Sequence, residues 1–137
     1  MGTKQLAGTI VGGVVLYGLG YLMFSRAFAA FYAANGGSAT GVDRSPELVW
    51  AVALGCLAYA ALITFALGSR GALSITQGAL VGAIVGFLIW FTADFTLYGV
   101  TNISNLTRTM VDPLLEIVRG SISGAAIAAV VRPKATA

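Results

Sequence analysis

The sequence contains no histidine and only one cysteine, Cys56, among its 137 residues. Histidine is the usual protein ligand of haem iron and a frequent ligand of zinc and copper, and its absence also excludes catalysis by a histidine base. A single cysteine can form neither a disulfide within the chain nor a cysteine cluster for a metal. We therefore expect a chain with no metal site and no cofactor that is not an enzyme.

Charged residues are also scarce, at 9% of the chain, whereas 58% of the residues are hydrophobic. A soluble domain carries roughly a quarter charged residues to keep its surface wet. The mean hydropathy of +0.88 instead fits a chain whose outer surface faces the lipid bilayer. The eight lysines and arginines are scattered singly, so the net charge of +3 provides no basic patch for nucleic acid.

Four hydrophobic stretches, each long enough to cross a bilayer, are separated by short polar breaks. The segments Ser45-Pro46-Glu47 and Asp112-Pro113 are typical of helix beginnings, and Pro133 is typical of a helix end. The sequence therefore predicts an all-α integral membrane bundle of four transmembrane helices. The expected spans, within one domain of residues 1–137, are about 6–32, 46–67, 75–98 and 113–131.

The positions of lysine and arginine indicate the orientation, because these residues are enriched in cytoplasmic loops. If both termini are cytoplasmic, the inside holds more basic residues than the outside, where Arg44 and Arg108 would lie. We therefore expect cytoplasmic termini. The composition, rich in alanine and glycine, is typical of bacteria and favours the bacterial cytoplasmic (inner) membrane. The basic residues assigned to the inside are Lys4, Arg70, Arg132 and Lys134.

Glycines recur at four-residue spacing in the third and fourth stretches, which places them on one face of each helix. A helix face without side chains lets a neighbouring helix approach closely. Two interpretations remain open: these faces pack the four helices together, or one of them contacts a partner chain. The glycines are Gly78, Gly82 and Gly86 in the third stretch, and Gly120 and Gly124 in the fourth.

Ionisable residues inside the spans are the candidate functional residues, because a charge in lipid is costly without a partner. Glu116 and Arg119 are three residues apart and can pair on one helix face. Asp94 is expected to pair across helices with Arg119 or with Arg26. Thr96 lies two residues beyond Asp94 and offers a hydroxyl group. Counted along the expected helices, the charged groups lie at a similar depth in the outer third of the membrane.

Three interpretations of this polar cluster remain open: a neutral clamp that fixes the helix register, a polar pocket open to the outer face, or a proton or ion path. Against a path, the cytoplasmic halves of the expected helices contain almost no ionisable residues. Lipid or an apolar pigment can also occupy grooves between the helices, since such ligands need no diagnostic residues.

The segment from Trp90 to Thr96, Trp-Phe-Thr-Ala-Asp-Phe-Thr, follows a glycine-rich stretch, and Glu116-Ile-Val-Arg119-Gly120 follows in the next helix. Together with Phe31-Tyr32, these motifs resemble a family of uncharacterised small bacterial membrane proteins with four spans. That family has an aromatic-rich segment ending in Asp-aliphatic-Thr in its third helix. The resemblance implies the four-helix fold and singles out Asp94 and Glu116, and it implies no activity.

The sequence favours a non-catalytic accessory or scaffold subunit that packs against other membrane protein subunits of a larger complex. The expected loops are too short to hold a soluble domain, no catalytic set is present, and glycine faces are plentiful. The alternative is a small-solute or ion transporter, as a homodimer, that uses Asp94, Glu116 and Arg119. An intramembrane enzyme with two catalytic carboxylates is a third option, for which nothing positions a substrate.

Overall fold

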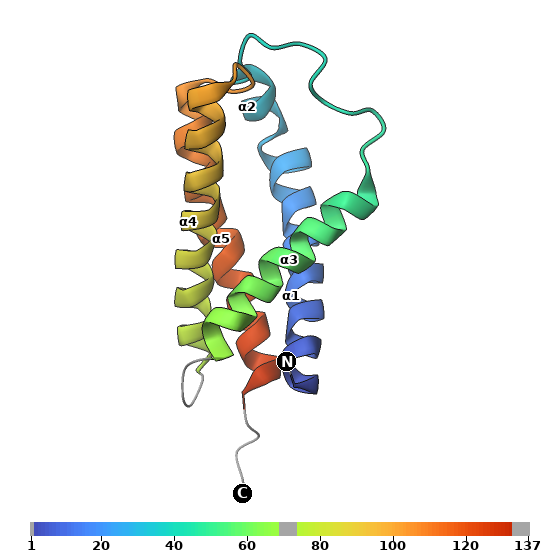
Figure 1. Ribbon diagram of the computed structural model, residues 1–137, viewed down its shortest axis with the longest axis vertical. Helices are drawn as coiled ribbons and strands as arrows, with labels where there is room; N and C mark the ends of the chain where they lie inside the picture. The colour runs from blue at the N-terminus through green and yellow to red at the C-terminus, as the bar shows by residue number, and fades with distance from the viewer. Residues whose placement is uncertain (1, 69–73, 133–137) are drawn as a thin grey trace, which may run out of the picture.

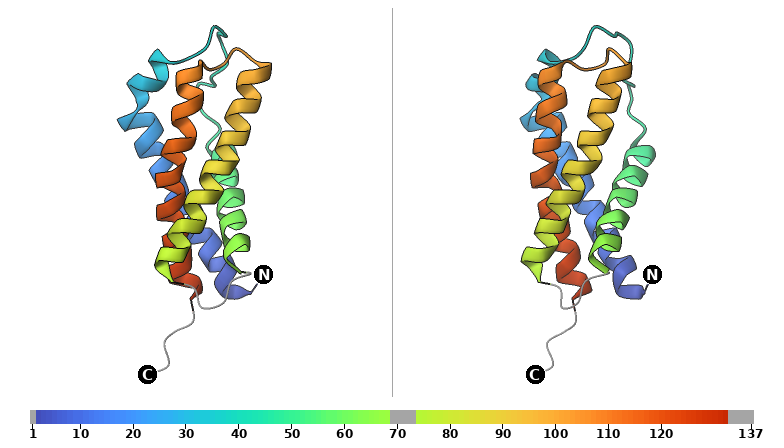
Figure 2. Two further views of the ribbon diagram at one scale, coloured as in Figure 1. Left: turned by 90° about the vertical axis from the view of Figure 1, so that its left-hand side faces the viewer. Right: turned by 60° about the vertical axis from the view of Figure 1, so that its left-hand side comes forward.

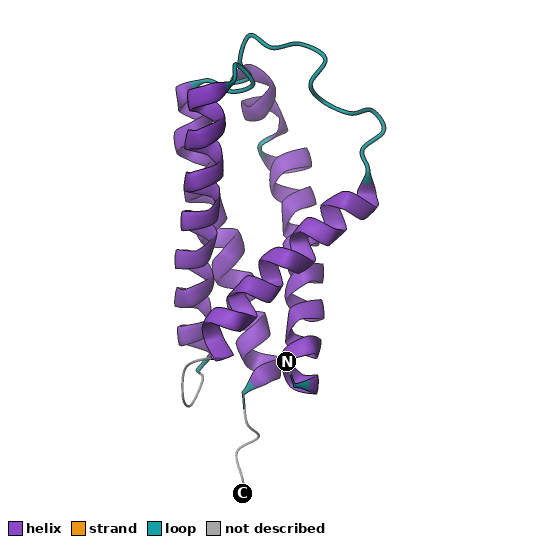
Figure 3. Ribbon diagram, viewed as in Figure 1, coloured by secondary structure: helices purple, strands orange, loops and turns teal. Residues whose placement is uncertain are grey.

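The computed structural model describes residues 2–68 and 74–132, and these residues are almost entirely helical (Figure 3). Four helical segments are long and apolar enough to cross a membrane, so the prediction of an all-α membrane bundle with four spans is confirmed. The helices are α1 (Thr3–Leu22), a π-helical turn η1 (Met23–Ala27), α2 (Ala29–Ala34), α3 (Val49–Gly68), α4 (Ile75–Val100) and α5 (Leu106–Val131).

The bundle has two distinct ends (Figure 1). The N-terminus and the last described residues of α5 lie at one end, here called the terminal end. The loop of residues 35–48 and the connection between α4 and α5 lie at the other, here called the loop end. Which end faces the cytoplasm stays a prediction, and two residues on which it depends, Arg70 and Lys134, fall outside the described residues, as does Pro133.

Helices α4 and α5 run side by side along their length, whereas α3 crosses the bundle obliquely (Figures 1 and 2). The core forms where α3 meets α1, α4 and α5, around Leu16, Ile63, Leu67 and Ile127, all fully buried. The outer faces of the helices remain apolar and exposed, as expected for surfaces in contact with lipid. Helix α3 contributes residues to the cavity described below.

The glycine faces of α4 and α5 contact each other, as the first of the two interpretations given above expects. A β-carbon on Gly82 would lie 2.8 Å from the carbonyl carbon of Gly120 and 3.0 Å from the α-carbon of Gly124. Gly78 meets the backbone of Gly124 in the same way, and the backbone at Glu116 lies against Gly86. These atoms belong to the backbone and cannot move aside, so the close approach depends on glycine.

Three expected span boundaries are wrong. Helix α5 begins at Leu106 instead of residue 113, because the Asn105 side chain accepts a hydrogen bond from the backbone N–H of Arg108 (2.9 Å) and caps the helix there. Pro113 lies inside this helix, as membrane helices tolerate. Helix α3 begins at Val49, and Pro46 stays in the preceding loop.

The first span also differs from the expected residues 6–32. It ends in a π-helical turn at Met23–Ala27, with the backbone N–H of Phe28 bonded to the carbonyl of Met23 (2.8 Å), and a bend at Phe28 separates it from the next helix. The continuous span therefore covers Thr3–Ala27, and α2 forms a separate short helix. The π-turn inserts an extra residue into the helix and rotates every side chain beyond it around the axis.

Candidate functional site

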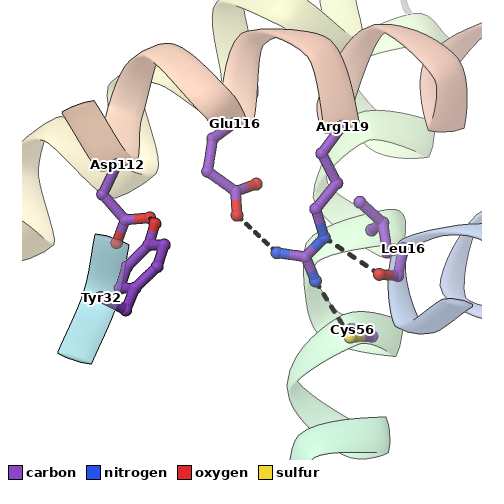
Figure 4. A network of polar contacts seen from close by, with 6 residues as sticks. All are labelled: Leu16, Tyr32, Cys56, Asp112, Glu116 and Arg119. Carbon is purple, nitrogen blue, oxygen red and sulfur yellow. Dashed lines mark hydrogen bonds and ion pairs between the residues drawn. The ribbon is translucent and has the colours of Figure 1, made fainter. Parts of the chain in front are cut away.

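Three ionisable side chains, Asp112, Glu116 and Arg119, project from one face of α5 (Figure 4). Their spacing of four and three residues places them in a row along the helix. Glu116 is completely buried, and Arg119 is 6% exposed. Because α5 begins at Leu106, the pair of Glu116 and Arg119 lies near the middle of this span and not in its outer third.

Arg119 joins three helices through its guanidinium group (Figure 4). Nη1 pairs with Oε1 of Glu116 at 2.5 Å, Nε donates to the backbone carbonyl of Leu16 (3.0 Å), and Nη2 donates to Sγ of Cys56 (3.4 Å). A guanidinium carries five N–H groups, so one on Nη1 and one on Nη2 remain unused among the described residues. Gly20 of α1 leaves space beside the group, since a β-carbon there would lie 3.1 Å from Nη2.

Glu116 is only half satisfied by this pairing. Its second oxygen, Oε2, is buried without a hydrogen-bond partner among the described residues. The Tyr59 hydroxyl of α3 is the neighbouring polar group, and it too is buried without a well-formed hydrogen bond among the described residues. A hydroxyl can donate to a carboxylate oxygen, so these two groups are complementary neighbours at the centre of the bundle.

A second polar contact lies toward the loop end, where the Tyr32 hydroxyl of α2 donates a hydrogen bond to Oδ1 of Asp112. Burial, and next this hydrogen bond, raise the pKa of Tyr32 well above its ordinary value. The guanidinium of Arg108 lies over the Tyr32 ring, 4.9 Å from its centre. The carboxyl of Asp94 on α4 faces that of Asp112 across the helix pair.

Removing the Tyr32 hydroxyl tests this contact. We expect Tyr32→Phe to lower the free energy of unfolding by about 1–3 kcal/mol, because the buried Asp112 carboxyl loses its donor. Denaturant unfolding in detergent micelles measures the difference. Tyr98→Phe is the matched control, since Tyr98 is 41% exposed. Equal stability of the two variants would show that the bond contributes nothing.

A cavity of about 880 Å³ lies beside the pair of Glu116 and Arg119. Residues of α1, η1, α3, α4 and α5 line it, and most of the lining is apolar or aromatic. Arg119, Tyr59 and Trp90 contribute to its wall, as do Arg108 and Glu47, which carry opposite charges. A smaller cavity of about 340 Å³, lined by Asp94 and Asp112 among others, lies at the loop end, and Trp90 and Arg108 border both.

The structure brings together some of the predicted site residues and separates others. Glu116 and Arg119 form the expected pair. Asp94 faces Asp112 and not Arg119 or Arg26. Because α5 begins earlier than expected, Asp112 and not Arg119 lies at the level of Asp94. Thr96 is exposed, since two residues along a helix turn a side chain about 200° away from Asp94.

Arg26 also lies apart from the cluster. It is exposed and donates through Nε and Nη2 to the Tyr21 hydroxyl, with the Nε bond at 2.9 Å. The π-helical turn that contains Arg26 changes the face on which it lies, which an uninterrupted helix does not predict. The expectation that Arg26 helps to neutralise Asp94 is therefore wrong.

Several residues of the site were not predicted. Asp112 was interpreted as a helix start, although its four-residue spacing from Glu116 places both on one face. Cys56 is buried in the core and also accepts a hydrogen bond from Arg119. Tyr59 and Trp90 line the cavity from α3 and α4, and no local sequence signal indicates this placement.

Comparisons with protein-family models, with curated proteins and with solved structures find no match. The resemblance to small bacterial four-span proteins therefore stays a prediction. Among the described residues, no group of three or more His, Cys, Asp or Glu side chains could hold a metal ion. The cavity and the pair of Glu116 and Arg119 are the features from which a function has to be inferred.

Proposed function

We propose that this chain is a non-catalytic membrane protein that binds an amphipathic monocarboxylic acid, such as a long-chain fatty acid, in the cavity beside Arg119. One observation carries the proposal: a largely apolar cavity of about 880 Å³ has a buried guanidinium in its wall. Small-molecule sites typically measure about 300–1,000 Å³ and combine apolar walls with a few placed polar groups. The cavity fits this description in both size and lining.

The chemistry of the wall suits the two parts of such a ligand. Aromatic and aliphatic side chains, including Phe24 and Leu62, can contact an apolar tail. The guanidinium of Arg119 can offer paired donors to a carboxylate once Glu116 releases Nη1. Tyr59 contributes to the same wall, but its buried hydroxyl lies against Gly86 and Gly120 and offers no donor to the cavity. A neutral apolar pigment would leave all of these donors unused.

The other functions expected from the sequence remain proposals with less support. The accessory-subunit hypothesis relied partly on free glycine faces, but the faces of α4 and α5 are occupied by each other. A transporter for a small solute would share the binding step proposed here. The bacterial cytoplasmic membrane remains the proposed location, on the composition alone.

Fluorescence quenching by a brominated fatty acid tests the binding. The chain has two tryptophans: Trp90 lines the cavity, whereas Trp50 is 68% exposed on the outside of the bundle. In phosphatidylcholine vesicles, we expect dibromostearate to quench the Trp50→Phe variant, which retains only Trp90, with a saturable curve. The Trp90→Phe variant, which retains only Trp50, should show only the gradual quenching caused by partition into the bilayer.

Two controls separate binding from partition. Dibromostearyl alcohol has the same tail without the charge and should quench Trp90 without saturation. The double substitution Glu116→Leu with Arg119→Met, made in the Trp50→Phe background, should abolish saturation by the acid. The proposal is wrong if dibromostearate quenches both single-tryptophan variants with the same non-saturating curve.

A further inference from the structure

We infer that the cavity binds its acid together with one proton, which Glu116 takes up when the incoming carboxylate replaces it on Arg119. This inference rests on the proposed function and describes how the same site binds the negative charge of the acid. In the structure, Glu116 occupies the guanidinium that the ligand would need, with 2.5 Å between Oε1 and Nη1. Glu116 therefore acts as an internal counter-ion that a bound acid must displace.

Among the described residues, no second cation acts on Glu116. The titratable groups that act on it are Arg119 and Asp112 on its own helix, Tyr59 and Cys56 on α3, Asp94 on α4 and Tyr32 on α2. Arg119 is the only cation in this set. From α1, the nearby polar contact is the Leu16 carbonyl, which accepts from Arg119 and not from Glu116.

A second carboxylate on Arg119 would thus leave the site with one uncompensated negative charge. Glu116 is fully buried, and an unpaired charge in such a place is costly enough that the group neutralises instead. Uptake of one proton by Glu116 restores the charge balance. In the empty site, ionised Glu116 pairs with Arg119. In the occupied site, the ligand carboxylate pairs with Arg119 and Glu116 is neutral. No covalent bond forms or breaks apart from the new O–H.

The arrangement around Oε2 provides a place for this proton. Oε2 and the Tyr59 hydroxyl face each other, and both lack hydrogen-bond partners among the described residues. An ionised carboxylate can only accept hydrogen bonds, whereas a protonated one can donate its O–H to the Tyr59 oxygen. Release from Arg119 frees the Glu116 side chain to make this bond. The Tyr59 hydroxyl can thus partner Glu116 in either state, as a donor to the ionised carboxylate and as an acceptor from the protonated one.

The test uses a long-chain alkyl sulfonate, which stays ionised at any pH of interest and cannot carry the proton itself. The sulfonate competes with dibromostearate for the Trp50→Phe variant in phosphatidylcholine vesicles. We expect its affinity to fall about tenfold for each unit of rising pH over the range in which Glu116 is ionised in the empty site and protonated in the occupied one, the dependence of one proton taken up per ligand. Calorimetry in two buffers with different ionisation enthalpies should count the same single proton.

Two variants assign the proton to its residue. Glu116→Gln should bind the sulfonate with an affinity that no longer depends on pH, because no carboxylate competes for Arg119. Asp112→Asn should retain the tenfold dependence, since Asp112 bonds to Tyr32 and not to Arg119. If Glu116→Gln does not fold, the calorimetric proton count on the protein with Glu116 and Arg119 intact still tests whether binding takes up a proton.

The outcomes distinguish the two proposals. Absence of saturable binding of either ligand at every pH overturns the proposed function. Saturable binding of the sulfonate with no proton uptake overturns the coupling and leaves the function standing. Loss of the pH dependence in Asp112→Asn, with retention in Glu116→Gln, also overturns the coupling, because it assigns the proton to the wrong carboxyl.

Discussion

Arg119→Met is expected to lower the free energy of unfolding by about 3–5 kcal/mol, because it leaves the Glu116 carboxylate buried without its cation. The substitution also removes the bonds to the Leu16 carbonyl and to the Cys56 sulfur, which tie α5 to α1 and α3. Reversible denaturant unfolding in detergent micelles, followed by circular dichroism, gives the difference.

The double substitution Glu116→Leu with Arg119→Met provides the matched control. Replacement of both members of a buried ion pair by apolar residues of similar volume is often neutral, so we expect the double variant to recover most of the lost stability. The two single variants and the double variant form a thermodynamic cycle that measures the coupling. Additive losses in the cycle would contradict the account, since they would mean that the two side chains do not stabilise each other.

Gly82→Ala should lower the free energy of unfolding by about 3 kcal/mol, at the upper end of the usual cost of overpacking. Its new β-carbon would overlap the Gly120 carbonyl oxygen and lie 3.0 Å from the α-carbon of Gly124. Only a separation of α4 from α5 relieves this overlap, because all of these atoms belong to the backbone. Cysteine pairs placed across the two helices should then cross-link more slowly than in the parent protein.

Gly18→Ala is the control for that substitution. Gly18 lies in α1, and a β-carbon there would meet nothing within 4 Å. Alanine is the better helix former by about 1 kcal/mol, so Gly18→Ala should leave the protein as stable or slightly more stable. A similar loss in both variants would show that the cost arises from the helix backbone and not from the contact between α4 and α5.

Much of the fold could be predicted from the sequence, because length and hydropathy are local properties of each span. Helix ends were harder to predict. Asp112-Pro113 and Asn105 are both acceptable helix beginnings, and only the hydrogen bond from Arg108 to Asn105 decides between them. The glycine spacing indicated a close contact but not its partner, since four-residue spacing is the same for a contact within the chain and between chains.

The site was predictable only where it is local. Glu116 and Arg119 are three residues apart on one helix, so their pairing follows from helical geometry. The contact between Asp94 and Asp112 depends on the register of α4 against α5. The expected start of α5 was wrong, so the expected register of the two helices was wrong as well. The cavity is lined by residues of several helices, so it depends on tertiary packing that no spacing along the chain encodes.

Native mass spectrometry of the protein, extracted gently from its own membranes, tests the central claim that the cavity beside Arg119 holds an amphipathic acid. We expect chains that carry one bound carboxylic acid, and we expect the Glu116→Leu, Arg119→Met double variant to lose it. The same bound molecules on both proteins, or none on either, would contradict the claim. Recovery of the chain at a fixed ratio with a larger complex, and without a bound acid, would contradict it as well and support an accessory subunit.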